Sequence, residues 1–202
     1  MGGHDWTKGI EGIVMARTHY EKHQGTFSDK AHMLARELVY PSFFGNRPER
    51  YVIHRVGDGE ENTRLDGEQA IDLTVYSKKA ERLRHPLGFT FQERFRRRRY
   101  EPYSDVTITE FNEASGKPSE LYKIEATYFT YGYFGEIENT FGRVIIFNVQ
   151  ELKRLISKNA LRFTTNQNPK KQSFVCIPIA ALEHYGLIHW DSKNNGTANS
   201  IK

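Results

Sequence analysis

The chain has 202 residues and a formal net charge of +4, a length that favours one domain with a substantial core. It has no run of about 18 apolar residues and no apolar segment near its start. We therefore expect no membrane span or signal peptide, and a cytoplasmic location. The single Cys176 excludes an intramolecular disulfide and a cysteine zinc cluster, and it is expected to be buried.

The N-terminal part of the chain is expected to be helical. Residues 1–27 form an extension with a short helix over residues 10–23, and a second helix begins at Ser28, a favourable N-cap. Pro41 and Gly45 end this second helix, and Glu37 adjoins its apolar face. That face comprises Ala31, Leu34, Ala35 and Leu38.

A loop and a strand follow this helix. The loop carries Phe43, Phe44 and Arg47, which either wedge against bases or cap the core. Residues 51–56 read as a strand and residues 57–61 as a turn. Asp66 either closes the turn into the next strand or supplies a carboxylate to a bound ion.

Two strands with alternating apolar residues form the centre of the chain. In residues 71–75, Asp72 lies on the polar face. In residues 89–95 the same alternation places Gln92 and Arg94 on the polar face, and Glu93 among phenylalanines. An unpaired buried carboxylate is costly, so either a bulge rotates Glu93 outward or it has a partner.

A hairpin-like connection over residues 77–88 would place these two strands side by side. Asp72 would then share a face with Gln92 and Arg94. Oxygen ligands of this kind suit Mg²⁺ or Mn²⁺, and such an ion can polarise a phosphate and activate water. The central strands therefore predict a metal site beside a phosphate.

Arginines concentrate around these strands, including the run Arg96–Arg99. Such cations can neutralise nucleic-acid phosphates, with an affinity that falls as salt rises. Charge on an edge strand that resists aggregation is the other interpretation.

The remaining elements complete an α/β (α+β) fold, with a central mixed sheet of about five strands flanked by helices. Strands are expected at residues 105–111, 121–134 and 143–147, and shorter ones at 161–165, 174–177 and 187–190. Asn148 and Glu151 form a capping-box-like helix start, and Pro178 opens a short helix. The domain spans residues 28–190, and residues 191–202 form a polar, flexible tail.

The central motif resembles that of the PD-(D/E)XK, or restriction-endonuclease-like, nucleases: Asp72, then about twenty residues, then Gln92-Glu93-Arg94. The resemblance extends over residues 28–157. Gln92 stands in the acid position and Arg94 in the lysine position, and arginine cannot take a proton from water. If the register shifts by one residue, Glu93 takes the acid position and Phe95 the lysine position.

The resemblance implies a Mg²⁺- or Mn²⁺-dependent DNA endonuclease, perhaps of restriction type. It assigns catalysis to Asp72, Gln92, Glu93 and Arg94, and metal binding to Asp72, Glu93 and, from the first helix, Glu37. Arg47 and Arg96, Arg97, Arg98 and Arg99 would contact DNA. Double-strand cleavage needs two such sites, which makes a homodimer plausible. The alternatives are a catalytically weak or inactive nucleic-acid-binding protein of the same fold, and a protein-interaction module with a basic face.

Overall fold

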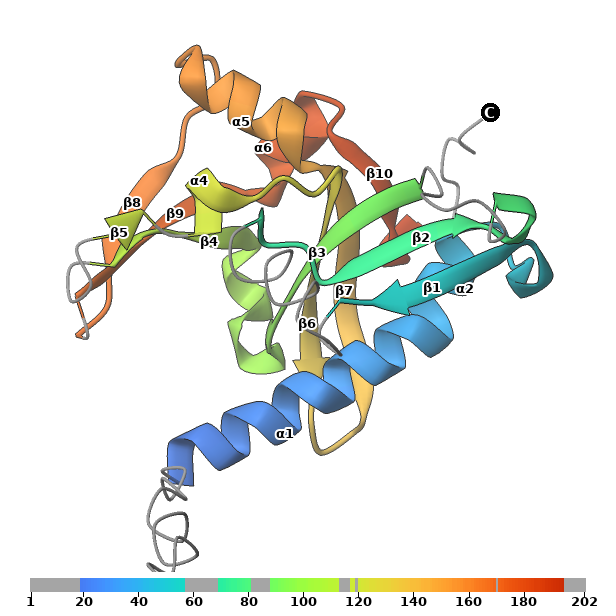
Figure 1. Ribbon diagram of the computed structural model, residues 1–202. Helices are drawn as coiled ribbons and strands as arrows, with labels where there is room; N and C mark the ends of the chain where they lie inside the picture. The colour runs from blue at the N-terminus through green and yellow to red at the C-terminus, as the bar shows by residue number, and fades with distance from the viewer. Residues whose placement is uncertain are drawn as a thin grey trace, which may run out of the picture.

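A computed structural model describes residues 19–56, 69–80, 88–112, 117–118, 120–169 and 171–194. Its largest feature is a mixed six-stranded sheet with the strand order β1-β2-β3-β6-β7-β10 (Figure 1). These strands are β1 (Tyr51–Arg55), β2 (Leu73–Ser77), β3 (Gly88–Arg97), β6 (Tyr128–Gly135), β7 (Thr140–Asn148) and β10 (Ile188–Asp191). The predicted α+β class with a central mixed sheet is confirmed, with six strands in place of about five.

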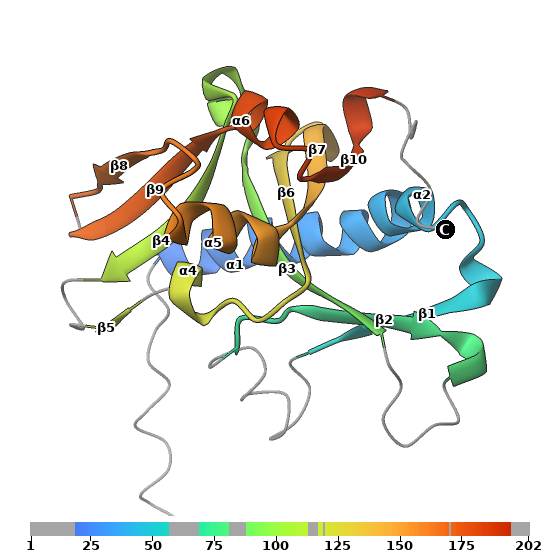
Figure 2. The same ribbon diagram turned by 90° about the horizontal axis from the view of Figure 1, so that it is seen from above.

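A second sheet was not predicted from the sequence. Its order is β5-β4-β9-β8, and all its pairings are antiparallel. It extends away from the six-stranded sheet at the left of Figures 1 and 2. Its strands are β4 (Asp105–Asn112), β5 (Lys117–Pro118), β8 (Thr164–Gln167) and β9 (Gln172–Pro178).

The N-terminal helix is continuous where the sequence predicted a break. Helix α1 (His19–Leu34) runs through Ser28, so the predicted N-cap is wrong and the proposed boundary after residue 27 falls inside a helix. The reason is packing: Phe27 and Ala31, one turn apart, are both buried against Phe134. The predicted helix over residues 10–23 lies mostly outside the described part of the chain.

The helical path also continues past Pro41. A π-helical turn, η2 (Ala35–Val39), leads directly into α2 (Tyr40–Phe43). Pro41 lies in the first turn of α2. The expectation that Pro41 ends the helix is therefore wrong, whereas Gly45, with a φ of 75°, follows the end of α2 at Phe43 as expected. The continuation past Pro41 positions Tyr40.

The central strands pair as the hairpin prediction required. Strand β2 is antiparallel to both β1 and β3, and Leu73 lies opposite Phe91. Strand β3 is then parallel to β6, with Glu93 opposite Thr130. This parallel pair needs a long crossover, which is made by η5 (Arg98–Tyr103), strands β4 and β5 of the second sheet, and α4 (Glu120–Lys123).

The start of the predicted strand 121–134 is helical. Leu121 lies in α4, and both Leu121 and Ile124 are buried in the same core cluster. A helical turn brings residues three apart to one side, whereas an extended chain would point them to opposite sides. Strand β6 therefore begins only at Tyr128.

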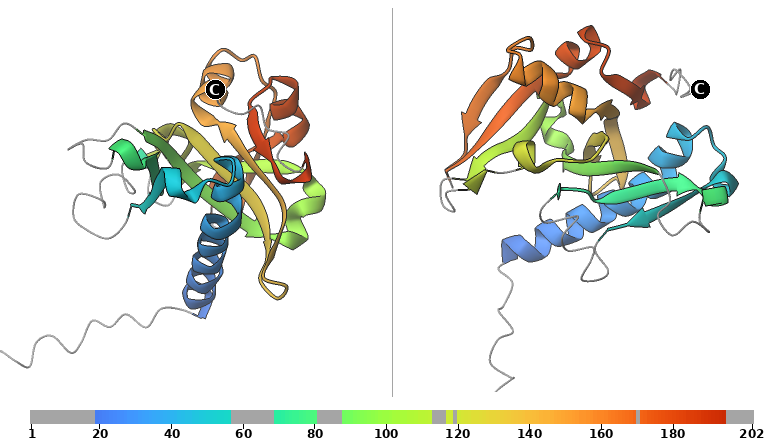
Figure 3. Two further views of the ribbon diagram at one scale, coloured as in Figure 1. Left: turned by 90° about the vertical axis from the view of Figure 1, so that its right-hand side faces the viewer. Right: turned by 45° about the horizontal axis from the view of Figure 1, so that its top comes forward.

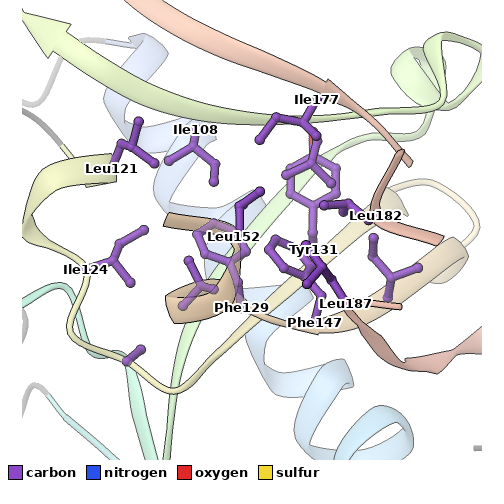
Figure 4. Close-up of a cluster of buried hydrophobic side chains, with 14 of the residues drawn as sticks. Ile108, Leu121, Ile124, Phe129, Tyr131, Phe147, Leu152, Ile177, Leu182 and Leu187 are labelled. Carbon is purple, nitrogen blue, oxygen red and sulfur yellow. The ribbon is translucent and has the colours of Figure 1, made fainter. Parts of the chain in front are cut away.

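The six-stranded sheet buries apolar side chains on both faces. Figure 3 shows the N-terminal helix, in blue, lying along one side of this sheet. One face packs against η2 and α2. The other packs against the second sheet and the helices α5 (Val149–Ser157) and α6 (Ile179–His184). Figure 4 shows this second cluster, which includes Ile108, Phe129, Tyr131, Phe147, Leu152, Ile177 and Leu182.

Other predictions hold with shifted bounds. The Glu151 N–H donates to Asn148 Oδ1 at 2.9 Å, which confirms the predicted cap of α5. The strand expected at 161–165 begins only at Thr164, since Leu161 is buried in the core. Cys176 is buried as expected. Short 3-10 turns are η3 (Pro48–Arg50), η4 (Lys78–Ala80) and η6 (Ser192–Asn194). Within the described residues, no helix is both long enough and apolar enough to cross a bilayer.

Candidate active site

Strand β3 presents two chemically different faces. Phe91 and Glu93 are buried on the face that packs against α1, η2 and α2. Gln92 and Arg94 point the other way, where they contact Glu120 of α4. The alternation of a regular strand thus places Glu93 and Arg94 on opposite sides of the sheet.

Glu93 is a buried carboxylate, 6% exposed, with a donor at each oxygen. The Tyr40 hydroxyl donates to Oε1 at 2.7 Å, and His32 Nδ1 lies 2.6 Å from Oε2. Tyr40 Oη also lies 3.0 Å from Thr130 Oγ1. Of the two alternatives for Glu93, a bulge or a partner, the structure shows the partner, and both partners come from the N-terminal helical segment.

Asp72 meets Glu93 at the point where β2 and β3 stop pairing. Asp72 Oδ2 accepts a hydrogen bond from the Glu93 backbone N–H at 2.6 Å. The backbone of Asp72 is hydrogen-bonded on both sides. Its carbonyl accepts from the N–H of Val56, just after β1, and its N–H donates to the carbonyl of Phe91. The two acids are therefore positioned by three neighbouring stretches of chain.

The approach to Asp72 contains a residue with unfavourable backbone geometry. Ala70, two residues earlier, has a φ of 47° in the left-handed region. This conformation costs a residue with a Cβ about 1–2 kcal/mol, and such costs concentrate at functional sites. Gln69, just before it, is fixed by a hydrogen bond from the Glu125 N–H to its carbonyl.

The acids at the site change the pKa values of His32 and Tyr40. Burial by itself lowers the pKa of His32, but its hydrogen bond to Glu93 and the charges of Glu93 and Asp72 outweigh burial. The pKa of His32 is therefore raised, and its charged form is favoured beside the two carboxylates. Burial and the charge of Glu93 raise the pKa of Tyr40, so that its hydroxyl stays a donor.

Gln92 and Arg94 do not join the acid pair, contrary to the sequence-based expectation. Arg94 forms an ion pair with Glu120 at 2.9 Å and donates to Thr109 Oγ1 at 2.9 Å. Gln92 donates to Glu120 at 3.4 Å. The expectation failed because Asp72 reaches Glu93 from the end of its strand, where strict alternation of faces no longer applies.

The geometry therefore matches the shifted register of the motif, with Glu93 in the acid position. Phe95 then occupies the lysine position. Its ring packs edge-on against His32, with centroids 5.3 Å apart, and against Phe141 at 5.2 Å. No amine enters the site from this position of β3.

The first-helix residue that reaches the acid pair is His32 and not Glu37. Glu37 is exposed, and it lines a separate hollow with Leu34 and Ile137. Asp66 lies outside the described residues. His32 and Tyr40 were missed because the sequence shows that Glu93 needs partners but not which residues they are.

The arginine run is largely engaged within the fold. Arg96 pairs with Asp105 at 3.2 Å, Arg97 with Glu136 at 2.7 Å, and Arg98 with Glu101 at 3.7 Å. Arg99 donates to the hydroxyl of Tyr100. The run is therefore not the set of unpaired cations that the sequence suggested, and DNA contact by these residues stays a prediction.

The aromatic loop after α2 caps the core, which decides between the two interpretations of it. The ring of Phe43 packs edge-on against Phe91, and Phe44 packs against Tyr51. Arg47 is exposed next to this cap, and its contact with DNA also stays a prediction.

The carboxylates of Asp72 and Glu93 suit a hard divalent ion that needs few ligands from the protein. Among the described residues, no group of three or more His, Cys, Asp or Glu side chains is arranged to hold a metal. Mg²⁺, however, is commonly held by one or two carboxylates, with water and substrate phosphate completing its shell. Asp72 and Glu93 would supply two such carboxylates, since the Glu93 backbone N–H donates to Asp72 Oδ2 and places the two residues side by side. The described residues build no all-protein cage.

Comparisons with known proteins found a structural match and no match in sequence. No protein-family model and no curated protein matches the chain. One similar solved structure is that of D212, a nuclease from a fusselovirus, with 12% identity and a TM-score of 0.39. The match covers 79% of this chain and 89% of that one. A TM-score of this size is too low to assign the chain to the fold family of that protein.

Proposed function

We propose that the chain is a divalent-metal-dependent nuclease that hydrolyses phosphodiester bonds in DNA, with Asp72 and Glu93 as its metal-binding acids. The observation that carries the proposal is that Asp72 Oδ2 accepts from the Glu93 backbone N–H where β2 and β3 part, and that both acids act on His32. A carboxylate buried as fully as that of Glu93 is expensive to fold. This cost together with strain at Ala70 favours a functional site.

Each residue has a defined part in this proposal. Tyr40 and His32 fix the orientation of the Glu93 carboxylate, since each holds one of its oxygens. The Glu93 side chain is only 1% exposed and that of His32 is 14% exposed, so substrate would approach from the side of Asp72 and His32. A bound Mg²⁺ or Mn²⁺ would supply Lewis-acid stabilisation of charge on the phosphate.

His32 would supply the positive charge that a lysine supplies in the motif. With Phe95 in the lysine position, the imidazole of His32 is the cationic group beside the acids. Its charged form would attract a phosphate oxygen to the site. His32 is therefore the residue of this chain that takes over the electrostatic part of the lysine's role.

Cleavage of supercoiled plasmid DNA in the presence of Mg²⁺ or Mn²⁺ tests the proposal. Asp72→Asn and Glu93→Gln should each abolish cleavage, while Gln92→Ala, a change at the neighbouring residue on the opposite face, should retain it. A second readout needs no activity: Mg²⁺ should raise the melting temperature of the wild type and not that of Glu93→Gln. Loss of cleavage in Gln92→Ala but not in Glu93→Gln would refute this assignment.

A nucleic-acid-binding protein without catalysis is the second candidate. Both oxygens of Glu93 already have protein donors, and Phe95 replaces the lysine, which are observations that favour it. Salt-sensitive DNA binding without metal-dependent cleavage, and without a metal-induced rise in melting temperature, would select this candidate.

A further inference from the structure

A cleft lies on the opposite side of β3 from the acid pair. It has a volume of about 690 Å³ and runs between β3 with η5 and the hairpin β8–β9 of the second sheet. This volume is within the range of about 300–1,000 Å³ that ligand sites occupy. Neither Asp72 nor Glu93 lines it.

One wall of the cleft carries side-chain amides. These groups both donate and accept hydrogen bonds, which is the chemistry that recognises the edges of nucleobases. All four residues of β8 are exposed, so this strand is not covered by another described element. The amides along this wall belong to Asn166, Gln167, Asn168 and Gln172.

The facing wall carries aromatic rings and guanidinium groups. The Arg96 guanidinium lies 4.4 Å from the centroid of the Tyr100 ring, and that of Arg99 lies 5.0 Å from it. Tyr103 follows at a centroid distance of 6.4 Å from Tyr100 and is 71% exposed. An aromatic side chain this exposed at the rim of a polar cleft offers a face on which a base can stack.

The charge of the flanking segments selects a polyanion over a neutral ligand. Residues 94–105 contain five arginines and two acids, and residues 158–178 contain four basic residues and no acid. Both segments border the cleft. Arg94, Arg96, Arg97 and Arg98 are each paired with a carboxylate. The surplus of positive charge therefore comes from Arg99 and from the second segment, and it would attract phosphates.

We propose that this cleft binds single-stranded nucleic acid, with bases against the amides and Tyr103 and phosphates towards the arginines. A single strand is required because only unstacked bases expose both their ring faces and their hydrogen-bonding edges. The cleft and the acid pair lie on opposite faces of β3. The binding site is therefore separate from the proposed cleavage site and does not depend on it.

Fluorescence anisotropy with a labelled oligothymidylate and the full chain tests this inference. Tyr103→Ala should weaken binding about tenfold, because stacking on one aromatic ring contributes about 1–3 kcal/mol. Tyr103→Phe should restore the wild-type affinity, since the ring is what stacks. Tyr122→Ala removes another exposed tyrosine, 58% exposed and away from the cleft, and should leave affinity unchanged.

Glu93→Gln separates this proposal from the nuclease proposal. It should keep the affinity for oligothymidylate whether or not the wild type cleaves DNA. Equal losses in Tyr103→Ala and Tyr122→Ala would overturn the inference. So would an affinity for a duplex of the same length that equals the affinity for the single strand, or the absence of binding at low salt.

Discussion

Replacing Tyr40 by phenylalanine removes one hydroxyl from the contacts around Glu93 and leaves the ring in place. Tyr40 is fully buried, and its ring packs edge-on against Phe91 at a centroid distance of 5.1 Å. The hydroxyl donates to Glu93 Oε1 at 2.7 Å and lies 3.0 Å from Thr130 Oγ1. Tyr40→Phe therefore isolates the polar part of this contact from the packing.

The expected loss can be estimated from these two contacts. A hydrogen bond to a charged group contributes about 1.5–3 kcal/mol, and a neutral one about 0.5–1.5 kcal/mol. The hydroxyl makes one of each kind with Glu93 and Thr130, so we expect the free energy of unfolding to fall by about 2–4 kcal/mol. For a chain of this size that corresponds to a fall in melting temperature of roughly 4–16 °C.

Urea unfolding followed by circular dichroism measures this loss, provided that the denaturant slope m is the same in both proteins. Tyr103→Phe is the matched control, because it removes the same hydroxyl from an exposed tyrosine. It should change the free energy of unfolding by less than about 0.5 kcal/mol. If Tyr40→Phe changes it equally little, Glu93 is not held by Tyr40 and the proposed organisation of the site is wrong.

Two further predictions concern charges. Arg143→Met should destabilise the fold by about 3 kcal/mol or more, because it leaves the carboxylate of Asp191, which is 7% exposed, without its guanidinium partner. Thermal unfolding measures this loss of stability. A loss below about 1 kcal/mol would contradict the prediction. The pKa of His32 is raised above its ordinary value of 6.5, so its pairing with Glu93 stabilises the fold fully below about pH 6.5 and is lost as the pH rises through the raised value. The stability difference between the wild type and His32→Gln, measured in urea at about pH 6 and about pH 9, should therefore be larger at the lower pH, and a difference independent of pH would contradict the pairing.

The separation of Glu93 from Arg94 changes how the motif is understood. Read as a linear pattern, Gln92, Glu93 and Arg94 are one catalytic triplet. In the fold they are divided between a buried acid site and a polar face that borders a cleft. Strand β3 lies in the middle of a sheet, and its polar side chains have partners on both faces.

The local pattern of the sequence was sufficient for β1, β2 and β3, for the cap of α5, and for the conclusion that Glu93 needs a bulge or a partner. These features depend on alternation, capping and the cost of a buried charge, which act over a few residues. The second sheet, the unbroken helix through Ser28 and the helical turn at Leu121 were not predicted, because each is decided by packing against distant segments.

The sequence by itself determined that Glu93 falls among phenylalanines in the alternation of β3, so that it needs either a bulge or a partner. Only the tertiary structure decided that Glu93 is buried with partners, and which residues these partners are. His32 and Tyr40 lie 61 and 53 residues from Glu93 along the chain. Contacts over such separations depend on how the helical segment is laid across the sheet, and that placement is set by the whole apolar core and not by any local pattern.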